Sequence, residues 1–269
     1  MDLRGKVALI TGASRGIGRA LSLALADSGC GVLLTALERG ELAALAHDLA
    51  NRPSRHAPRR TIVATKPADL TDPVQRRALV DWVRAHDPPI DILVNNAGGG
   101  RFERFDASSP EEIGRTLALN VEAPTQLARQ LLPDLKSRPE ARIVIVSSGI
   151  ARLPYPGLAV YGAAKGYLSS LSESLACELR GTSVGVLCVH PGFTATHFME
   201  SAAMDMSRVP RAAVHSPERV AARIVRALER DESWLFTDTG SRLAAALAGL
   251  LPRNLRTRVF QNLFWRVPS

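Results

Sequence analysis

Short continuous apolar runs alternate with longer segments in which apolar residues recur at helical spacing. The runs indicate strands and the periodic segments indicate helices. Strands without a polar face are typical of a parallel sheet that is covered on both sides. The alternation therefore predicts an α/β fold, a Rossmann-like doubly wound parallel sheet flanked by helices. The predicted strands are 6–11, 32–35, 61–65, 91–94, 142–146 and 184–189, and the predicted helices are 17–28, 41–50, 73–85, 110–132, 160–179 and 217–230.

No linker rich in glycine or serine and no internal repeat divides residues 1–240, so we expect one catalytic domain there. Pro124 lies inside the predicted helix 110–132 and is expected to kink it. Residues 241–269 differ from the rest, because apolar positions such as Leu255, Val259 and Phe260 recur at helical spacing among arginines. This segment predicts a basic amphipathic helical extension that packs on the domain, on a subunit interface or on a membrane surface.

Composition narrows the function classes. The 269 residues are 46% hydrophobic and carry a net charge of +8, of which residues 241–269 supply five arginines and no acid. No DNA- or RNA-binding signature accompanies this charge, so nucleic acid is not an expected partner. Three widely spaced cysteines predict no disulfide framework, and six histidines without ligand spacing predict no metal site. The expected location is cytoplasmic, with peripheral membrane contact possible through residues 241–269, because neither a signal-peptide stretch nor a spanning segment is evident.

A glycine-rich loop follows the first predicted strand and precedes the first helix. Its sequence runs from Thr11 to Gly18 with the spacing Gly-x-x-x-Gly-x-Gly. Glycines allow a sharp turn and let backbone approach a pyrophosphate, which the N-terminus of the next helix attracts. The loop alone is weak evidence, and its place in an alternating fold strengthens it. The candidate cofactor contacts in the loop are Gly12, Ser14, Arg15, Gly16, Ile17 and Gly18.

This spacing, together with further motifs in the same order, resembles the short-chain dehydrogenase/reductase family in its compact single-domain form, from about residue 3 to 230. The resemblance implies that Asp69 and Leu70 contact adenine, and that Asn95-Asn96-Ala97-Gly98 forms a sheet-stabilising turn beside the cofactor. The implied nicotinamide contacts are Pro191, Gly192, Thr194 and Thr196, and the implied catalytic residues are Asn120, Ser148, Tyr161 and Lys165. Tyr161 and Lys165 also count among the expected cofactor contacts, and Ala97 and Gly98 join Asn95 there.

Tyr161 and Lys165 have i,i+4 spacing on a predicted helix, so their side chains share one face. A nearby ammonium lowers the pKa of a phenol from its usual value near 10, which makes tyrosine a usable general acid or base. Such a tyrosine would protonate a carbonyl oxygen as hydride reaches carbon, or remove a proton from a hydroxyl in the opposite direction. An i,i+4 pair is otherwise common on helix surfaces, and the resemblance is what favours catalysis.

Two polar positions complete the expected catalytic group. Ser148 lies thirteen residues before Tyr161 and can donate to a developing oxyanion. Its neighbour Ser147 is chemically equal, and the serine-to-tyrosine spacing of the family points to Ser148. Asn120 lies in an apolar helical stretch, where asparagine is disfavoured. The resemblance implies that Asn120 holds a water that relays protons to Lys165; the alternative is a local helix distortion.

The cofactor preference depends on the end of the second strand. An acid there would bind a ribose 2′-hydroxyl and reject the phosphate of NADP. The chain has none at that place, and Arg15 could pair with a 2′-phosphate, so NADP(H) is favoured and NAD(H) remains possible. Leu37 stands where relatives that prefer NADP often carry a second arginine. Arg39 could take the place of that second arginine, whereas the neighbouring acid Glu38 would disfavour a phosphate there.

The substrate side is expected in residues 149–160 and 193–214. Both segments are rich in apolar residues, including Phe198, Met204 and Met206. We therefore expect an apolar carbonyl or alcohol substrate, such as a lipid, steroid-like or aromatic compound. The expected assembly is a homodimer or homotetramer, which the resemblance implies. The alternative function is an NADP-binding regulatory or scaffold protein without turnover, for which a complete catalytic group would be unusual.

Overall fold

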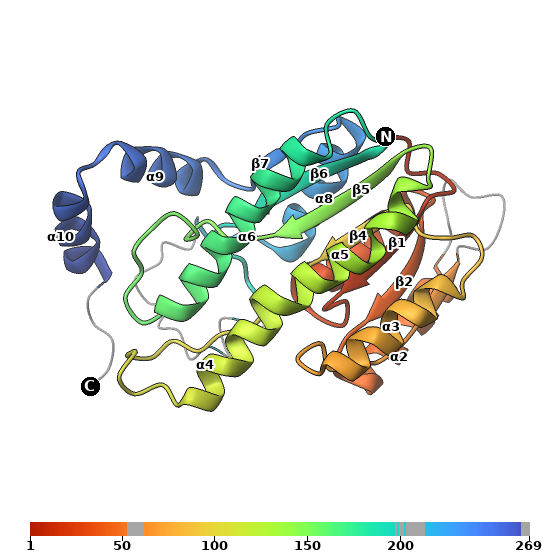
Figure 1. Ribbon diagram of the computed structural model, residues 1–269, viewed down its shortest axis with the longest axis horizontal. Helices are drawn as coiled ribbons and strands as arrows, with labels where there is room; N and C mark the ends of the chain where they lie inside the picture. The colour runs from red at the N-terminus through yellow and green to blue at the C-terminus, as the bar shows by residue number, and fades with distance from the viewer. Residues whose placement is uncertain (53–61, 197, 199–201, 203–212, 265–269) are drawn as a thin grey trace.

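A computed structural model describes the chain except for residues 53–61, 197, 199–201, 203–212 and 265–269. Its centre is a parallel sheet of seven strands in the order β3-β2-β1-β4-β5-β6-β7 (Figure 1). This confirms the predicted doubly wound fold. The strands are β1 (Val7–Thr11), β2 (Gly31–Thr35), β3 (Val63–Thr65), β4 (Ile92–Asn95), β5 (Ala141–Val146), β6 (Val184–His190) and β7 (Trp234–Phe236).

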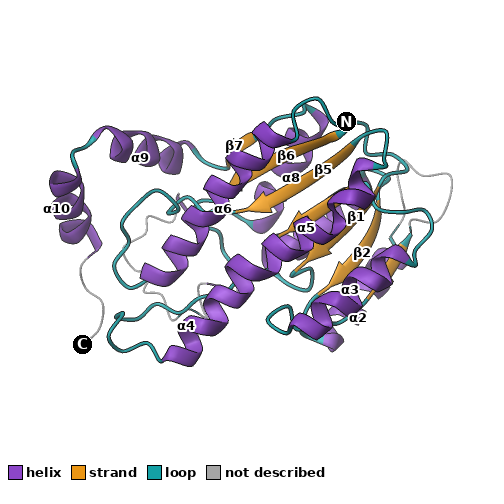
Figure 2. Ribbon diagram, in the orientation of Figure 1, coloured by secondary structure: helices purple, strands orange, loops and turns teal. Residues whose placement is uncertain are grey.

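Helices cover both faces of the sheet (Figure 2). One face packs against α1, α2 and α8, and the other against α3, α5 and α6. Proline follows the capping residue of α3, α4 and α8, where its missing N–H breaks no helical hydrogen bond. The helical elements are α1 (Gly16–Asp27), α2 (Arg39–Ala50), α3 (Pro73–Arg84), α4 (Pro110–Leu117), η1 (Ala118–Glu122), α5 (Ala123–Lys136), α6 (Ala159–Glu178), α8 (Pro217–Glu229), α9 (Thr239–Leu250) and α10 (Arg253–Phe264).

The middle positions of the central strands are apolar because each face of the sheet has its own core. In β1, Ala8 and Ile10 belong to the cluster on one face, whereas Val7 and Leu9 belong to the cluster on the other. Successive side chains of a strand point to opposite faces, so a strand covered on both sides needs no polar positions. Burial on both faces therefore explains why the strands of this sequence are continuous apolar runs and do not alternate between apolar and polar residues.

The strand order reverses at β1, whose neighbours are β2 on one side and β4 on the other. In an open parallel sheet, the crevice outside the carboxyl ends of the strands at such a reversal is the usual ligand site. The last strand, β7, was not predicted. It pairs with the end of β6, from Cys188 opposite Trp234 to His190 opposite Phe236, and so extends the sheet at the same carboxyl edge.

The predicted break in the helix 110–132 occurs, but before the proline rather than at it. A π-helical turn, η1, separates α4 from α5, and the N–H of Ala123 bonds the carbonyl of Ala118 five residues back. Pro124 then lies in the first turn of α5. A proline has no N–H to offer the carbonyl four residues earlier, here that of Asn120, so a regular α-helical turn is disfavoured at this point. The wide turn therefore carries Asn120.

The segment after β7 forms two helices, α9 and α10, which extend from the carboxyl edge of the sheet away from the body of the protein (Figure 1). Residues 255–264 are helical, as expected, and residues 265–269 of the predicted amphipathic pattern lie outside the described residues. Among the helices that the structure describes, none combines the length and apolar character that crossing a bilayer requires.

Candidate active site at the carboxyl edge of the sheet

The glycine loop is fixed to the turn after β4. Thr11 Oγ1 accepts hydrogen bonds from the backbone N–H groups of Asn96 and Ala97 at 2.9 and 3.0 Å. In return, Asn96 Nδ2 donates to the carbonyls of Thr11 and Gly12. The motif 95–98 and the glycine loop therefore form one unit across the point where the strand order reverses.

All three glycines of this loop are required by geometry, and the tightest is Gly18, where a Cβ would lie 2.1 Å from the carbonyl oxygen of Gly12. Gly12 has φ +62°, and a Cβ there would lie 2.9 Å from Cα of Ala97. Gly16 has φ +52°, and a Cβ there would lie 2.9 Å from Cγ2 of Thr196. No side chain caps the N-terminus of α1. The first N–H groups of this helix are therefore free of a side-chain cap beside a tight glycine turn, which is the arrangement that receives a pyrophosphate.

Tyr161 and Lys165 lie one turn apart on α6. The Lys165 side chain is buried, with 3% exposure, and its Nζ lies 5.5 Å from the centroid of the Tyr161 ring. That Nζ donates to the carbonyl of Val146 at 3.0 Å, at the end of β5. Ser148 lies close enough to the Tyr161 hydroxyl to lower the pKa of that phenol by hydrogen bonding. The structure thus brings together the phenol, the ammonium and the serine that the sequence singled out.

Burial governs the protonation of this pair in the protein without ligands. It raises the pKa of Tyr161 above its ordinary value of 10, and the hydrogen bond with Ser148 only partly opposes this effect. Burial also lowers the pKa of Lys165 to about 8. The expected lowering of the tyrosine pKa by the lysine is therefore not seen here. Desolvation dominates instead, since loss of water penalises the charged forms of both side chains. The phenol consequently holds its proton at neutral pH.

The two serines that were equal in sequence have different surroundings. Ser147 Oγ donates to the backbone carbonyl of Lys165 at 2.8 Å and shares a hydrogen bond with Ser169 Oγ at 2.9 Å. Ser169 in turn contacts Nε2 of His190 at 3.0 Å. Ser147 thus joins β5 to the helix that carries the lysine, whereas the Ser148 hydroxyl points to Tyr161.

Asn120 extends from the π-helical turn toward the lysine. Its Nδ2 donates to the carbonyls of Gly99 at 2.6 Å and Thr116 at 2.9 Å. Its Oδ1 is buried without a hydrogen-bond partner. A Cβ on Gly98 would lie 2.8 Å from that Oδ1 and 3.0 Å from Lys165 Nζ. Asn120 and Lys165 therefore flank Gly98, and the asparagine leaves an acceptor unused beside the ammonium.

The segment 191–196 is held by a part of the chain that the sequence analysis did not select. The N–H of Gly192 donates to Thr237 Oγ1 at 3.2 Å, and Thr194 Oγ1 donates to the Gly192 carbonyl at 2.9 Å. Asp238 follows, and its Oδ1 accepts from the N–H of Ser241 at 2.6 Å to cap α9. The predicted domain boundary at residue 240 falls inside this first turn. Contacts across 45 residues leave no local signal in a sequence.

Two more glycines make room for that turn. A Cβ on Gly192 would overlap the Asp238 carboxylate, whose Oδ2 is buried without a hydrogen-bond partner. A Cβ on Gly149, directly after Ser148, would lie 2.8 Å from Ser241 Oγ. The beginning of α9 therefore packs against the residue next to Ser148 and against a residue of the expected nicotinamide segment.

The expected adenine side carries both polar and apolar groups. Asp69 Oδ1 accepts from the backbone and the hydroxyl of Thr71 at 2.8 and 2.7 Å, and Leu70 is buried. Asn95 is buried and donates from Nδ2 to the carbonyl of Pro124 at 3.2 Å. Arg15 lies beside the glycine loop and forms an ion pair with Glu41 of α2. An incoming phosphate would have to share or replace that carboxylate.

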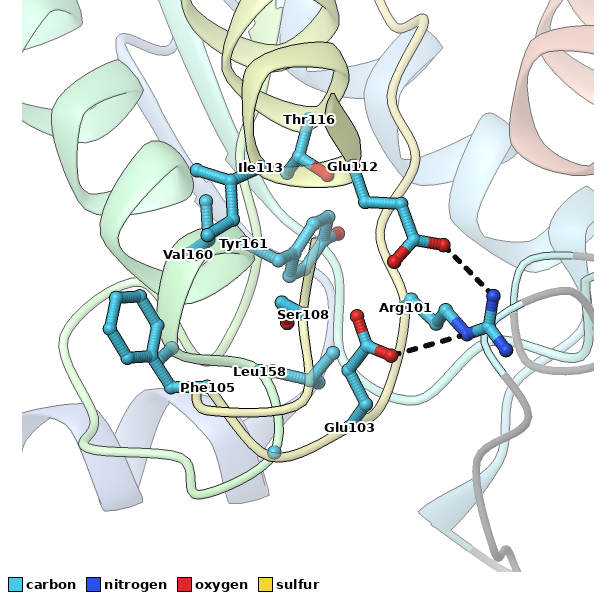
Figure 3. A pocket seen from close by; sticks show the side chains of 12 residues that line it. Arg101, Glu103, Phe105, Ser108, Glu112, Ile113, Thr116, Leu158, Val160 and Tyr161 are labelled. Carbon is cyan, nitrogen blue, oxygen red and sulfur yellow. Dashed lines mark hydrogen bonds and ion pairs between the residues drawn. The ribbon is translucent and has the colours of Figure 1, made fainter. Parts of the chain in front are cut away.

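A pocket opens on one side of the Tyr161 ring (Figure 3). Phe105, Ile113 and Leu158 provide apolar lining, and Arg101 pairs with Glu103 at 3.4 Å and Glu112 at 2.9 Å. The wall from residues 101–116 was not predicted, and it adds charge to a pocket that was expected to be apolar.

The two predicted substrate segments differ in how much of each lies near Tyr161 among the described residues. Residues 157–160 line the pocket, as part of the expected segment 149–160. In the second segment, the ring of Phe198 lies 4.9 Å from that of Tyr161 between centroids. Met199, Met204, Met206 and Val209 lie outside the described residues. No cluster of metal-ligating side chains occurs within the described ranges.

Comparison with known proteins agrees with this architecture. The chain is 30% identical to the 3-oxoacyl-[acyl-carrier-protein] reductase FabG of Escherichia coli over 242 residues. This alignment covers 88% of this chain and 95% of the relative. It spans only 18% and 60% of the length of two further curated relatives.

Solved structures show the same fold. A short-chain dehydrogenase from Sphingobium yanoikuyae in complex with NADPH superposes with a TM-score of 0.80 at 30% identity, over 91% of this chain and 94% of that one. A relative from Burkholderia phymatum in complex with NAD gives a TM-score of 0.80 at 25% identity, over 92% and 94%. The family model described as short chain dehydrogenase matches residues 6–207. The chain therefore belongs to the short-chain dehydrogenase family of oxidoreductases.

Proposed function

We propose that this protein transfers a hydride between NADP(H) and a carbonyl or secondary alcohol, with Tyr161 as general acid and base. One observation carries the proposal. The Tyr161 hydroxyl lies close enough to Ser148 for this serine to lower the pKa of the phenol, and one helical turn from the buried Lys165, where a pocket opens at the carboxyl edge of the sheet. A substrate oxygen placed between the two hydroxyls would receive a hydrogen bond from each.

The residues present fit a nicotinamide dinucleotide. The bare glycine loop and the uncapped N-terminus of α1 suit a pyrophosphate, and the orphaned Oδ1 of Asn120 beside Lys165 suits a water or hydroxyl donor. When bound, the cofactor supplies or accepts the hydride. The segment with Gly192 and Thr194 would contact the nicotinamide, and Lys165 would donate to its ribose.

The protein's own residues then handle the proton. Ser148 and Tyr161 donate to the substrate oxygen and stabilise the negative charge that develops there in reduction. Tyr161 gives its proton to that oxygen, and Lys165 stabilises the resulting phenolate. Asn120 orders the water through which the proton is restored. In the oxidative direction the same groups act in reverse, and Tyr161 takes the hydroxyl proton.

The preference for NADP(H) over NAD(H) rests on charge. The two positions directly after β2 carry no acid; Leu37 there is exposed and Glu38 comes only after it, and Arg15 lies at the edge of the glycine loop. One relative was solved with NADPH and another with NAD, so the family uses both. We expect Arg15→Ala to weaken NADPH binding about tenfold or more and NADH binding little, measured by fluorescence titration. Equal losses for the two cofactors would contradict the assignment of Arg15 to the 2′-phosphate.

For the substrate we favour an apolar ketone or alcohol, of lipid, steroid-like or aromatic type. The lining by Phe105, Ile113 and Leu158 supports this choice, while the Arg101 ion pairs add a polar group near the opening. A cytoplasmic homodimer or homotetramer without nucleic acid partners completes the proposal. A ketone panel in which only small charged substrates react would overturn the substrate class and leave the reaction class intact.

The reaction itself is tested by Tyr161→Phe. Loss of the phenolic proton should lower turnover about 10²- to 10⁴-fold with cofactor binding retained. Tyr167→Phe is the matched control, because Tyr167 lies on the same helix and its hydroxyl contacts only Thr125 among the contacts described. NADPH oxidation with a ketone panel gives the rate, and fluorescence titration gives binding. Cofactor binding without turnover of any ketone or alcohol by the wild-type protein would favour a regulatory or scaffold role.

A further inference from the structure

The two helices after β7 present leucines to solvent. Leu243, Leu247 and Leu250 are 61%, 52% and 82% exposed, and their i, i+4, i+7 spacing places them on one face of α9. The opposite face carries Ala245 and Ala248, which are buried. The usual arrangement is therefore inverted in α9. Its small alanines are buried, and its large leucines are exposed to solvent.

The two helices α9 and α10, which we call the arm, also carry an excess of positive charge. Asp238 is the last acidic residue of the chain, and residues 241–269 contain five arginines. On the part of α10 whose side chains are described, Arg258 is exposed and Arg256 is partly exposed, with Leu255 48% exposed nearby in sequence. Exposed leucines and arginines thus lie together on α9 and α10, which project from the body of the protein (Figure 1).

We propose that α9 and α10 dock on an anionic lipid surface, with the leucines entering the interface and the arginines pairing with headgroups. Charge complementarity decides for lipid over a second copy of this chain. In a twofold contact the same patch meets its own copy, which brings two sets of arginines into one interface without an acidic partner. Residues 1–240 also carry a net charge of +3, which offers no overall negative partner. An anionic bilayer satisfies both the leucines and the arginines.

The attachment of the arm gives this docking a direction. The first turn of α9 packs against Gly149 and Gly192, so the arm starts at the carboxyl edge that carries Tyr161. A docked arm holds that edge near the lipid. This placement is independent of the reaction that the site catalyses, and the binding test below needs no substrate.

The test is flotation of the full-length protein with vesicles of phosphatidylcholine alone and of phosphatidylcholine with phosphatidylserine. We expect binding to the anionic vesicles that weakens when salt is raised. Leu243→Ser with Leu247→Ser should lower binding on the order of tenfold. Arg256→Gln with Arg258→Gln should lower it roughly fivefold per arginine, on anionic vesicles only. Circular dichroism verifies that each variant is folded.

Matched controls lie on α3, far along the chain from the arm. Val74→Ser removes another exposed apolar side chain, and Arg77→Gln removes another exposed arginine; neither should change flotation. Wild-type protein that stays with the lipid-free fraction, or arm variants that float like wild type, would overturn the proposal. Sedimentation velocity without lipid tests whether a second copy of the chain covers this face instead. A wild-type oligomer that dissociates in the variant Leu243→Ser with Leu247→Ser would assign the face to a second copy and overturn the proposal.

Discussion

The buried ammonium of Lys165 should make the protein less stable at neutral pH than it would be without it. Its pKa falls from 10.5 to about 8 because burial penalises the charged form. This difference corresponds to about 3 kcal/mol of destabilisation below pH 8, where the lysine is protonated in both the folded and the unfolded state. Between pH 8 and 10.5 the unfolded chain binds more protons than the folded one, so stability rises with pH.

The variant Lys165→Met removes this penalty and keeps most of the side-chain volume. It also removes the donor to the carbonyl of Val146, and an unsatisfied buried acceptor costs about 1–3 kcal/mol. We therefore expect the inactive variant to be about 1–2 kcal/mol more stable than wild type at pH 7. The advantage should shrink as pH rises through 8 and reverse by pH 10, where the variant should be about 1 kcal/mol less stable than wild type, because the wild-type lysine then folds uncharged and still donates to Val146.

Urea denaturation of the cofactor-free protein, followed by circular dichroism at several pH values between 7 and 10, measures the difference. Lys136→Met on the exposed end of α5 is the control, and its difference from wild type should not vary across this interval. A Lys165→Met protein that is destabilised equally at pH 7 and pH 10 would refute the reasoning, because it would show that the folded state holds the ammonium without penalty.

Two further substitutions test separate parts of the site. Ser148→Ala should lower kcat on the order of 10²- to 10³-fold, whereas Ser147→Ala should mainly lower the free energy of unfolding by about 1 kcal/mol; similar kinetic losses in both would contradict their assigned roles. Gly192→Ala should destabilise by about 1–3 kcal/mol through overlap with Asp238, and Asp238→Ala should relieve part of that loss in the double variant; additive effects in urea denaturation would show that the two residues do not interact.

The sequence predicted what local patterns encode. Continuous apolar strands and amphipathic helices revealed the doubly wound sheet, and the i,i+4 pair Tyr161 and Lys165 lies where a helix was expected. The strand β7 was missed because three residues are too short to show a period. The clamp of Gly192 by Thr237, and the pocket wall from residues 101–116, arise from tertiary contacts that no window of sequence contains.

The position of the break before Pro124 has a similar explanation. Proline signals that a helix is disturbed, but not which residues absorb the disturbance. Here the preceding turn widens, and the side chain of Asn120 is anchored there by the carbonyls of Gly99 and Thr116. The choice between Ser147 and Ser148 likewise needed the family's spacing, because only the fold reveals that Ser147 bonds the backbone of Lys165 while Ser148 lies beside the Tyr161 hydroxyl.

The hydrogen bond between Gly192 and Thr237 also bears on when the site is assembled during synthesis. The nascent chain emerges from its N-terminus at about 5–20 residues per second, and domains acquire their contacts as segments become available. The glycine loop precedes residue 20, yet the turn that contacts it through Thr196 is held by a residue close to the end of the domain. In a chain interrupted before β7, the glycine loop would be present while the segment 191–196 lacked its hydrogen bond to Thr237. The edge of the sheet that holds the candidate site is therefore fixed only after nearly all of the domain has been synthesised.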